Sequence, residues 1–211
     1  MSNTGVRRFL GLGMVVVLLA GRTLAQDAAS STNSVGNLKD DNFQPGWREG
    51  TAGFGIMFSP IGSSYARPRV DYVPGYIEAG YMLSHIHGSG VLRNNYEIAI
   101  EAFGAGIYQS TGHYIAGGTL WLRHNLVLED SRFVPYAQVG GGLVSMDINH
   151  KYDGHNVNFN VDAAGGCRFF VKPKMSLNAE FLYQHISNAN TGSHNIGINA
   201  VGPILSASWF F

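Results

Sequence analysis

A histidine and a serine, His185 and Ser187, lie two positions apart in a stretch that alternates between polar and apolar residues. Residues i and i+2 of a β-strand project from one face, so these side chains would stand side by side. An imidazole that accepts the hydroxyl proton converts a serine into a nucleophile. If a hairpin turns near Gly192, Asn199 lies opposite His185, where its amide oxygen can accept the imidazole N–H. This spacing predicts a Ser/His hydrolytic site, in which amides of the hairpin stabilise an oxyanion.

The composition excludes several classes of protein. Lys and Arg equal Asp and Glu in number, 14 of each, so the chain lacks the basic surface that a nucleic-acid partner requires. Charged residues make up 13% of the chain, about half the fraction usual in a soluble enzyme. The 28 glycines and the 12% of aromatic residues suit a small β-barrel with aromatic girdles. The single cysteine, Cys167, rules out an internal disulfide.

Residues 1–25 predict a cleaved secretory signal peptide. Two arginines precede an apolar run at 9–20 that is too short to cross a bilayer comfortably, and small residues follow it at the cleavage position. Residues 26–48 are rich in Ser, Asn and Asp and predict a polar periplasmic lead-in or a plug-like segment, poorly ordered in either case. Residues 49–211 have the length of one domain.

Alternation with a period of two runs through residues 49–211, broken at regular intervals by Gly, Pro, Asn and Asp. The pattern predicts eight strands, at 51–58, 72–83, 95–108, 114–127, 133–145, 158–171, 175–187 and 196–211. One face of these strands is small or charged, and its charged members are Glu78, Glu97, Glu101, Arg123, Asp162, Arg168 and Glu180. The opposite face is almost uncharged.

This distribution of charge favours a barrel with its polar residues inside. Charges of both signs can pair within a narrow lumen, and an uncharged outer band suits lipid, where one charge near the midplane costs roughly 2–4 kcal/mol. Closure of the sheet satisfies every backbone amide, as lipid requires. We therefore predict an all-β fold, an eight-stranded antiparallel transmembrane β-barrel of the bacterial outer membrane. The terminal Phe211 resembles the assembly signature of such barrels. A soluble, lipocalin-like barrel is the alternative that the same alternation would serve.

An even number of strands places both ends of such a barrel in the periplasm, so the hairpin loop at 188–195 would face the exterior. Parity then decides where the site points. His185, Ser187 and Asn199 share the parity of the apolar, lipid-facing residues on their strands. Polar groups that face lipid are costly unless they are paired or functional.

The motif His-x-Ser-Asn-Ala, followed within the hairpin by Asn-x-Gly-Ile, resembles the outer-membrane lipid A 3-O-deacylase family (PagL-like) over about residues 180–200. The resemblance implies an eight-stranded barrel that hydrolyses the ester-linked acyl chain at position 3 of lipid A, without a metal or another cofactor. The roles that it implies are His185 as general base, Ser187 as nucleophile, and Asn188, Asn195 and Gly197 as oxyanion and loop support. The acyl chain would then lie along the apolar outer wall, where we expect Phe181, Tyr183 and Leu205 to contact it.

One residue departs from that family pattern. The third triad position of the family is a Glu on the last strand, and the matching residue here is Asn199. An amide oxygen can orient the imidazole but cannot stabilise the imidazolium by charge, and an amide in place of the carboxylate has cost about 10⁴ in rate in one serine protease. The sequence is therefore consistent with an active enzyme, a slow one or an inactive one. It is also consistent with a non-enzymatic barrel that binds lipopolysaccharide, mediates adhesion or supports the envelope.

The expected partners are lipid A, lipopolysaccharide and outer-membrane lipid, with a homodimer as a further candidate assembly. A channel is disfavoured, because side chains fill the interior of an eight-stranded barrel. His85 and His87 form a His-x-His pair without an acidic third ligand nearby, so no metal site is expected there.

Overall fold

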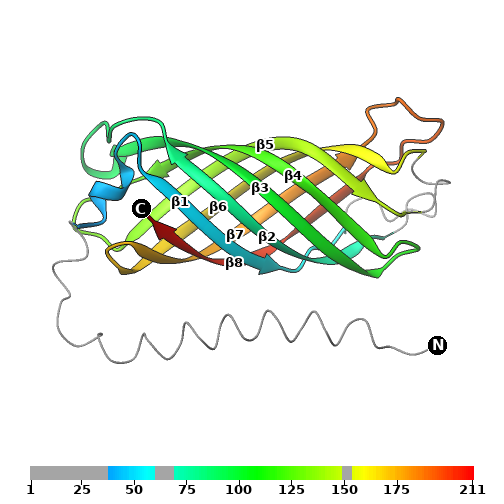
Figure 1. Cartoon of the computed structure of the whole chain (residues 1–211), viewed down its shortest axis with the longest axis horizontal. Helices are drawn as coiled ribbons and strands as arrows, with labels where there is room; N and C mark the ends of the chain where they lie inside the picture. Colours follow the sequence, from blue (N-terminus) through cyan, green and yellow to red (C-terminus); the bar gives the residue numbers. More distant parts are fainter. Residues whose placement is uncertain (1–37, 60–68, 149–153) are drawn as a thin grey trace.

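The computed structural model describes residues 38–59, 69–148 and 154–211, which form a closed antiparallel barrel (Figure 1). Its strands follow one another in sequence order, and the last pairs with the first. The strands are β1 Arg48–Gly55, β2 Asp71–Met82, β3 Asn94–Gln109, β4 Tyr114–Leu126, β5 Phe133–Met146, β6 Val157–Lys172, β7 Met175–Ser187 and β8 Ile198–Phe210, with short 3₁₀ turns at η1 Asp40–Phe43 and η2 Gly90–Leu92. No helix in these described ranges is long and apolar enough to cross a membrane. The predicted signal peptide lies outside the described residues.

The predicted fold class is confirmed, and each predicted strand is present with its ends shifted by a few residues at most. β7 has the predicted bounds. β1 begins and ends earlier than predicted, at Arg48 and Gly55. β8 begins later, at Ile198, because Gly197 before it has a φ of 67° and cannot continue a strand.

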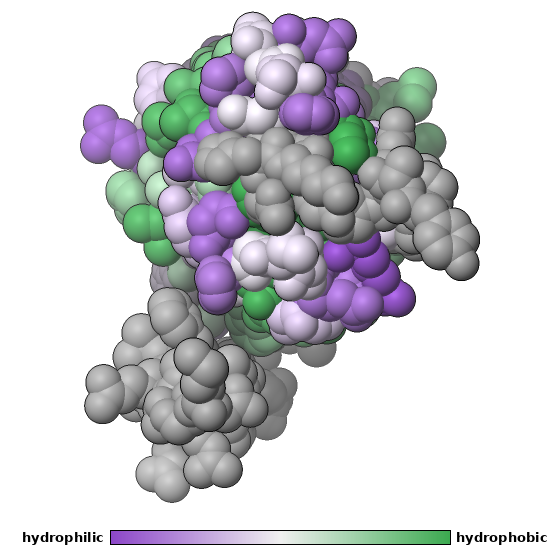
Figure 2. Space-filling model, turned by 90° about the vertical axis from the view of Figure 1, so that its right-hand side faces the viewer, coloured by the Kyte–Doolittle hydropathy of each residue, from purple (hydrophilic) through white to green (hydrophobic). Residues whose placement is uncertain are grey.

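Apolar side chains cover the outside of the barrel. The outward residues with large exposure include Phe54, Ile77, Ile100, Leu120, Val139, Val161, Phe181 and Leu205. The charged residues predicted to face the lumen are all buried or half-buried. Figure 2 looks onto the loop end of the barrel and shows hydrophilic side chains gathered there, with hydrophobic ones on the flanks. This arrangement is the reverse of a soluble barrel and is the one that lipid requires.

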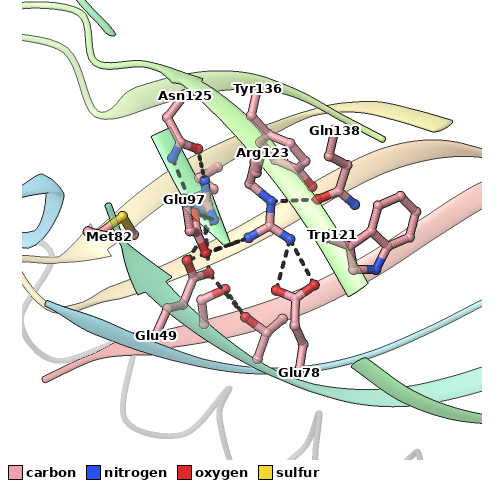
Figure 3. Close-up of polar contacts among 12 residues, drawn as sticks. Glu49, Glu78, Met82, Glu97, Trp121, Arg123, Asn125, Tyr136 and Gln138 are labelled. Atoms are coloured by element: carbon pink, nitrogen blue, oxygen red, sulfur yellow. Dashed lines mark hydrogen bonds and ion pairs between the residues drawn. The ribbon is translucent and has the colours of Figure 1, made fainter. Parts of the chain in front are cut away.

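An ion-pair network of arginines and glutamates lies in the lumen, near the end where β1 begins and β8 ends. Figure 3 shows the part of this network around Arg123. Arg123 donates to both carboxylate oxygens of Glu78 at 2.8 Å and to Glu97 at 2.9 Å. Arg168 contacts Glu49 at 2.6 Å and Glu97 at 3.0 Å. Each of these buried carboxylates thus has a guanidinium partner, which a charge taken out of water requires. The network ties together five strands across the lumen.

The η1 turn closes this same end of the barrel. Phe43 in η1 is fully buried, and its ring lies 5.9 Å from the ring of Phe170 on β6. The side chain of Asn42 donates to the Pro173 carbonyl at 2.6 Å and is also buried. The part of the predicted lead-in or plug-like segment that contains Asn42 and Phe43 therefore packs into the barrel mouth through an aromatic anchor, rather than being poorly ordered. Residues 26–37 lie outside the described ranges.

Candidate active site

The hairpin of β7 and β8 carries the predicted catalytic residues to the loop end of the barrel, the end opposite its C-terminus (orange to red at the right of Figure 1). His185 pairs directly with Asn199 in the antiparallel register, as the predicted turn requires. Gln184 and Ile186, on either side of His185, are buried in the lumen. Because side chains alternate along a strand, His185 and Ser187 point outward, toward lipid.

An amide oxygen holds the imidazole of His185. Asn199 Oδ1 lies 2.8 Å from His185 Nδ1. An amide oxygen only accepts hydrogen bonds, so the imidazole must donate through Nδ1, and the neutral ring then carries its lone pair on Nε2. Tyr183 donates its hydroxyl to the same oxygen, also at 2.8 Å. His185 thus presents a proton acceptor on the side away from Asn199, as a general base must.

Ser187 follows on the same face, and Gly197 lies beside both His185 and Ser187, the two predicted catalytic residues that we call the dyad. A Cβ placed on Gly197 would lie 3.3 Å from His185 Cε1 and 3.8 Å from Ser187 Cβ. The Cε1 atom of the imidazole, which lies between the two ring nitrogens, and the half-buried serine are therefore both close to Gly197. Within the described ranges, no residue forms a hydrogen bond with the Ser187 hydroxyl. Rotation about χ1 of the serine changes the position of Oγ relative to the imidazole.

Asn188 and Asn195 shape the hairpin loop. Asn188 is buried and donates its side-chain amide to the His194 carbonyl at 2.7 Å. Its backbone N–H donates to Asn195 Oδ1 at 3.2 Å, and Asn195 Nδ2 donates to Asn190 Oδ1 at 3.0 Å. Of the three residues predicted to support the oxyanion and the loop, Gly197 is the one that lies against the dyad. Asn188 and Asn195 instead make hydrogen bonds within the loop that precedes Gly197.

Apolar side chains of β6 flank the dyad on the outer wall. Val161 pairs with His185 in register, and Phe159 pairs with Ser187. Both are exposed on the outer surface. Sequence reasoning missed these two neighbours, because alternation assigns them to the outer face without giving the register of β6 against β7. The polar side chains of the dyad are therefore flanked by apolar side chains on the outer wall.

The three predicted acyl-chain contacts also lie on this wall. Phe181 and Leu205 are 58% and 54% exposed, and both lie nearer to the middle of the barrel than the dyad. Tyr183 lies between Phe181 and the dyad along β7, and its hydroxyl turns to Asn199. An apolar chain that lies along these side chains would reach the dyad from the side of the bilayer.

Within the described ranges, three glutamates, Glu49, Glu78 and Glu97, have carboxylate oxygens close enough together to share a metal ion. Arg123 and Arg168 already supply the positive charge among these carboxylates. The cluster faces the lumen, whereas the dyad faces outward. This carboxylate cluster is therefore separate from the candidate active site on the outer wall.

A family model described as lipid A 3-O-deacylase (PagL) matches residues 93–208, which is more than half of the chain. The chain belongs to the lipid A 3-O-deacylase family. The matched region contains the dyad, Asn199 and the flanking residues of β6. This deacylase-family chain is thus an outer-membrane barrel of a family directed at lipid A. A search of curated proteins found no match.

Three solved structures are similar to this chain. Neisserial surface protein A is 15% identical with a TM-score of 0.52, over 77% of this chain and 95% of that one. The crystal structure of the outer membrane enzyme PagL is 13% identical with a TM-score of 0.49, over 75% of this chain and 97% of that one. The N-terminal β-barrel domain of Pseudomonas aeruginosa OprF is 14% identical with a TM-score of 0.47, over 79% and 98%. The likeness to Neisserial surface protein A shows an outer-membrane barrel fold.

Proposed function

We propose that this deacylase-family chain is an esterase that removes the acyl chain at position 3 of lipid A, with Ser187 as nucleophile and His185 as general base. The observation that supports this most is the 2.8 Å contact between His185 Nδ1 and Asn199 Oδ1 on the lipid-facing wall. That contact orients a base two residues from a serine on the same face. Residues 1–25 serve as the cleaved signal peptide that exports the chain.

In the first step, Ser187 Oγ attacks the ester carbonyl while its proton passes to His185 Nε2. The carbonyl electrons move onto the oxygen to give a tetrahedral oxyanion. This intermediate collapses as the imidazolium returns the proton to the sugar oxygen that leaves. In the second step, water attacks the acyl ester on Ser187, and His185 accepts the water proton and returns it to Oγ. The products are a 3-hydroxy fatty acid and lipid A with one acyl chain fewer.

The oxyanion needs hydrogen-bond donors close to the serine. The Asn188 N–H already donates to Asn195 Oδ1, so the backbone around Gly197, which borders both the imidazole and the serine, is the better source. Asn199 orients His185 but adds no negative charge to stabilise the imidazolium. Formation of the charged intermediate is therefore the step that this site catalyses least well.

The substrate reaches the site through the membrane. The dyad lies near the loop end of an outer wall that is otherwise apolar, and lipid A occupies the leaflet on that side of a barrel with periplasmic termini. Its acyl chain can lie along Phe181 and Leu205, while the ester reaches Ser187. Binding at the outer wall therefore requires no cavity in the barrel.

Expression in a host that carries fully acylated lipid A tests this function. Mass spectrometry of lipid A should show the loss of one 3-hydroxyacyl group from position 3, and Ser187→Ala should abolish that loss. Ser193→Ala removes an exposed serine from the same hairpin and should leave the spectrum of the wild type. An unchanged spectrum with wild-type protein at confirmed surface expression would favour a non-enzymatic barrel, for which the uncharged Asn199 is the supporting observation.

A further inference from the structure

Two donors converge on one oxygen of Asn199. His185 Nδ1 lies 2.8 Å from Oδ1, and the Tyr183 hydroxyl lies at the same distance from the same atom. Tyr183 pairs with Val201 in register, so it lies diagonally across the two strands from Asn199. That diagonal is within the reach of an aromatic side chain. Among the described residues, the hydrogen bonds of the Asn199 side chain both end at its oxygen.

A side-chain amide can turn over and exchange its oxygen with its NH₂ group. With the oxygen toward His185, Nδ1–H donates and Nε2 keeps the lone pair that accepts the Ser187 proton. With the NH₂ group toward His185, the amide donates to Nδ1, the ring proton sits on Nε2, and the ring can no longer take the serine proton. The orientation of the Asn199 amide therefore decides whether His185 can act as a base.

We propose that Tyr183 is a positioning residue that fixes this orientation. Its hydroxyl donates to Oδ1. In the opposite orientation the hydroxyl would have to accept from the NH₂ group. A phenol is a stronger donor than acceptor, because its oxygen lone pair is conjugated with the ring, so the contact favours the oxygen toward the imidazole. A carboxylate at position 199 has two equivalent oxygens and no NH₂ group, so it needs no such partner. Tyr183 has this role because the chain carries an asparagine where its family has a glutamate. The role rests on the proposed Ser/His mechanism, and Tyr183 acts through His185 rather than on the ester.

The test compares Tyr183→Phe, which keeps the ring on the outer wall and removes only the hydroxyl, with Tyr81→Phe, a change to an exposed tyrosine on the outer face of β2. Nitrogen-15 NMR of histidine-labelled protein in detergent micelles reports the tautomer of His185, and His185→Gln identifies its signals. We expect Tyr183→Phe to move His185 from the Nδ1–H form toward the Nε2–H form. Tyr81→Phe should leave the tautomer unchanged.

Kinetics give the second readout. Tyr183→Phe should lower kcat about tenfold, the contribution of one hydrogen bond to the competent state, with KM unchanged. In an Asn199→Asp background the same change should lower kcat less than about twofold, because a carboxylate cannot turn the wrong way. Tyr81→Phe should leave kcat and KM unchanged. The double variant keeps the test available if Tyr183→Phe alone folds poorly.

An unchanged His185 tautomer in Tyr183→Phe would overturn the proposal, and so would an equal loss of kcat in the Asn199 and Asn199→Asp backgrounds. The tautomer is read without substrate, which separates this proposal from the proposed function. If Tyr183→Phe shifts the tautomer while Ser187→Ala still releases the acyl chain, the positioning of His185 stands and the role of Ser187 as nucleophile fails.

Discussion

Asn199 Oδ1 and His185 Nδ1 lie 2.8 Å apart at paired positions of β8 and β7. The distance is that of a well-formed hydrogen bond, so Asn199 has the position of a triad's third member. It lacks the charge that stabilises an imidazolium. We therefore expect a base that is correctly oriented in an enzyme that is slower than a carboxylate at this position would make it.

Asn199→Asp tests this account by adding the charge without changing the shape of the side chain. We expect the initial rate of acyl release to rise at least about tenfold, since the reverse exchange cost about 10⁴ in one serine protease. Asn190→Asp is the matched control, because it adds the same charge to an exposed loop residue whose oxygen already accepts from Asn195. An equal acceleration by both variants would mean that general charge, not contact with His185, sets the rate.

Gly197→Ala tests the packing of the dyad. The φ of 67° at Gly197 lies in a region where a side chain costs roughly 1–2 kcal/mol, and the new Cβ would also lie 3.3 Å from His185 Cε1. We expect both a lower stability and at least about a tenfold loss of activity, because the imidazole must move.

Gly46→Ala provides the comparison for this variant. Gly46 has a φ of 91°, but its Cβ would lie 4.0 Å from the Tyr81 hydroxyl, at the other end of the barrel. It should lower stability and leave activity intact. A similar loss of activity in the two variants would show that backbone strain, and not contact with His185, causes the effect.

Arg123→Met tests the lumen network. The change leaves Glu78 with no ion pair among the described residues and removes one of the two partners of Glu97. Removing one partner of a buried pair costs about 3–5 kcal/mol, so the variant should unfold at lower temperature on heated gels. Arg48→Met removes an exposed arginine at the same end of the barrel and should unfold like the wild type. Equal unfolding temperatures for Arg123→Met and the wild type would contradict the stabilising role of the network.

Ile77→Arg tests the orientation of the wall. Ile77 lies in the middle of β2 and is 66% exposed on the outer surface. In vesicles an arginine at the midplane should lower the free energy of unfolding by roughly 2–4 kcal/mol, and Ile77→Ala should lower it much less. Urea titration of vesicle-inserted protein measures both values. Equal stabilities would mean that Ile77 does not face lipid.

Much of the fold can be predicted from alternation alone, because in lipid outward positions must be apolar and every backbone amide must be paired. The same parity gives the outward direction of His185 and Ser187. The hairpin then gives the pairing of His185 with Asn199, since the turn lies between them in the chain.

The other neighbours of the site depend on details that alternation does not contain. The pairing of β6 with β7 shifts register between Phe170 and Lys172, so the positions of Phe159 and Val161 beside the dyad cannot be read from the sequence. Alternation also places the ring of Tyr183 outward but not its hydroxyl, whose direction depends on Asn199 across the hairpin. The packing of Phe43 into the mouth of the barrel could not be predicted either, because the residues around it in the sequence are mostly polar.

In the proposed mechanism, Ser187 is activated by His185 and is the nucleophile on the lipid-facing wall. A fluorophosphonate with a long alkyl chain tests it most directly, because it resembles the ester and reacts with an activated serine. In a preparation that deacylates lipid A, we expect peptide mass spectrometry to find the adduct on Ser187, and to find none in His185→Ala. An adduct on another serine, or an active preparation in which Ser187 stays unmodified, would contradict the claim.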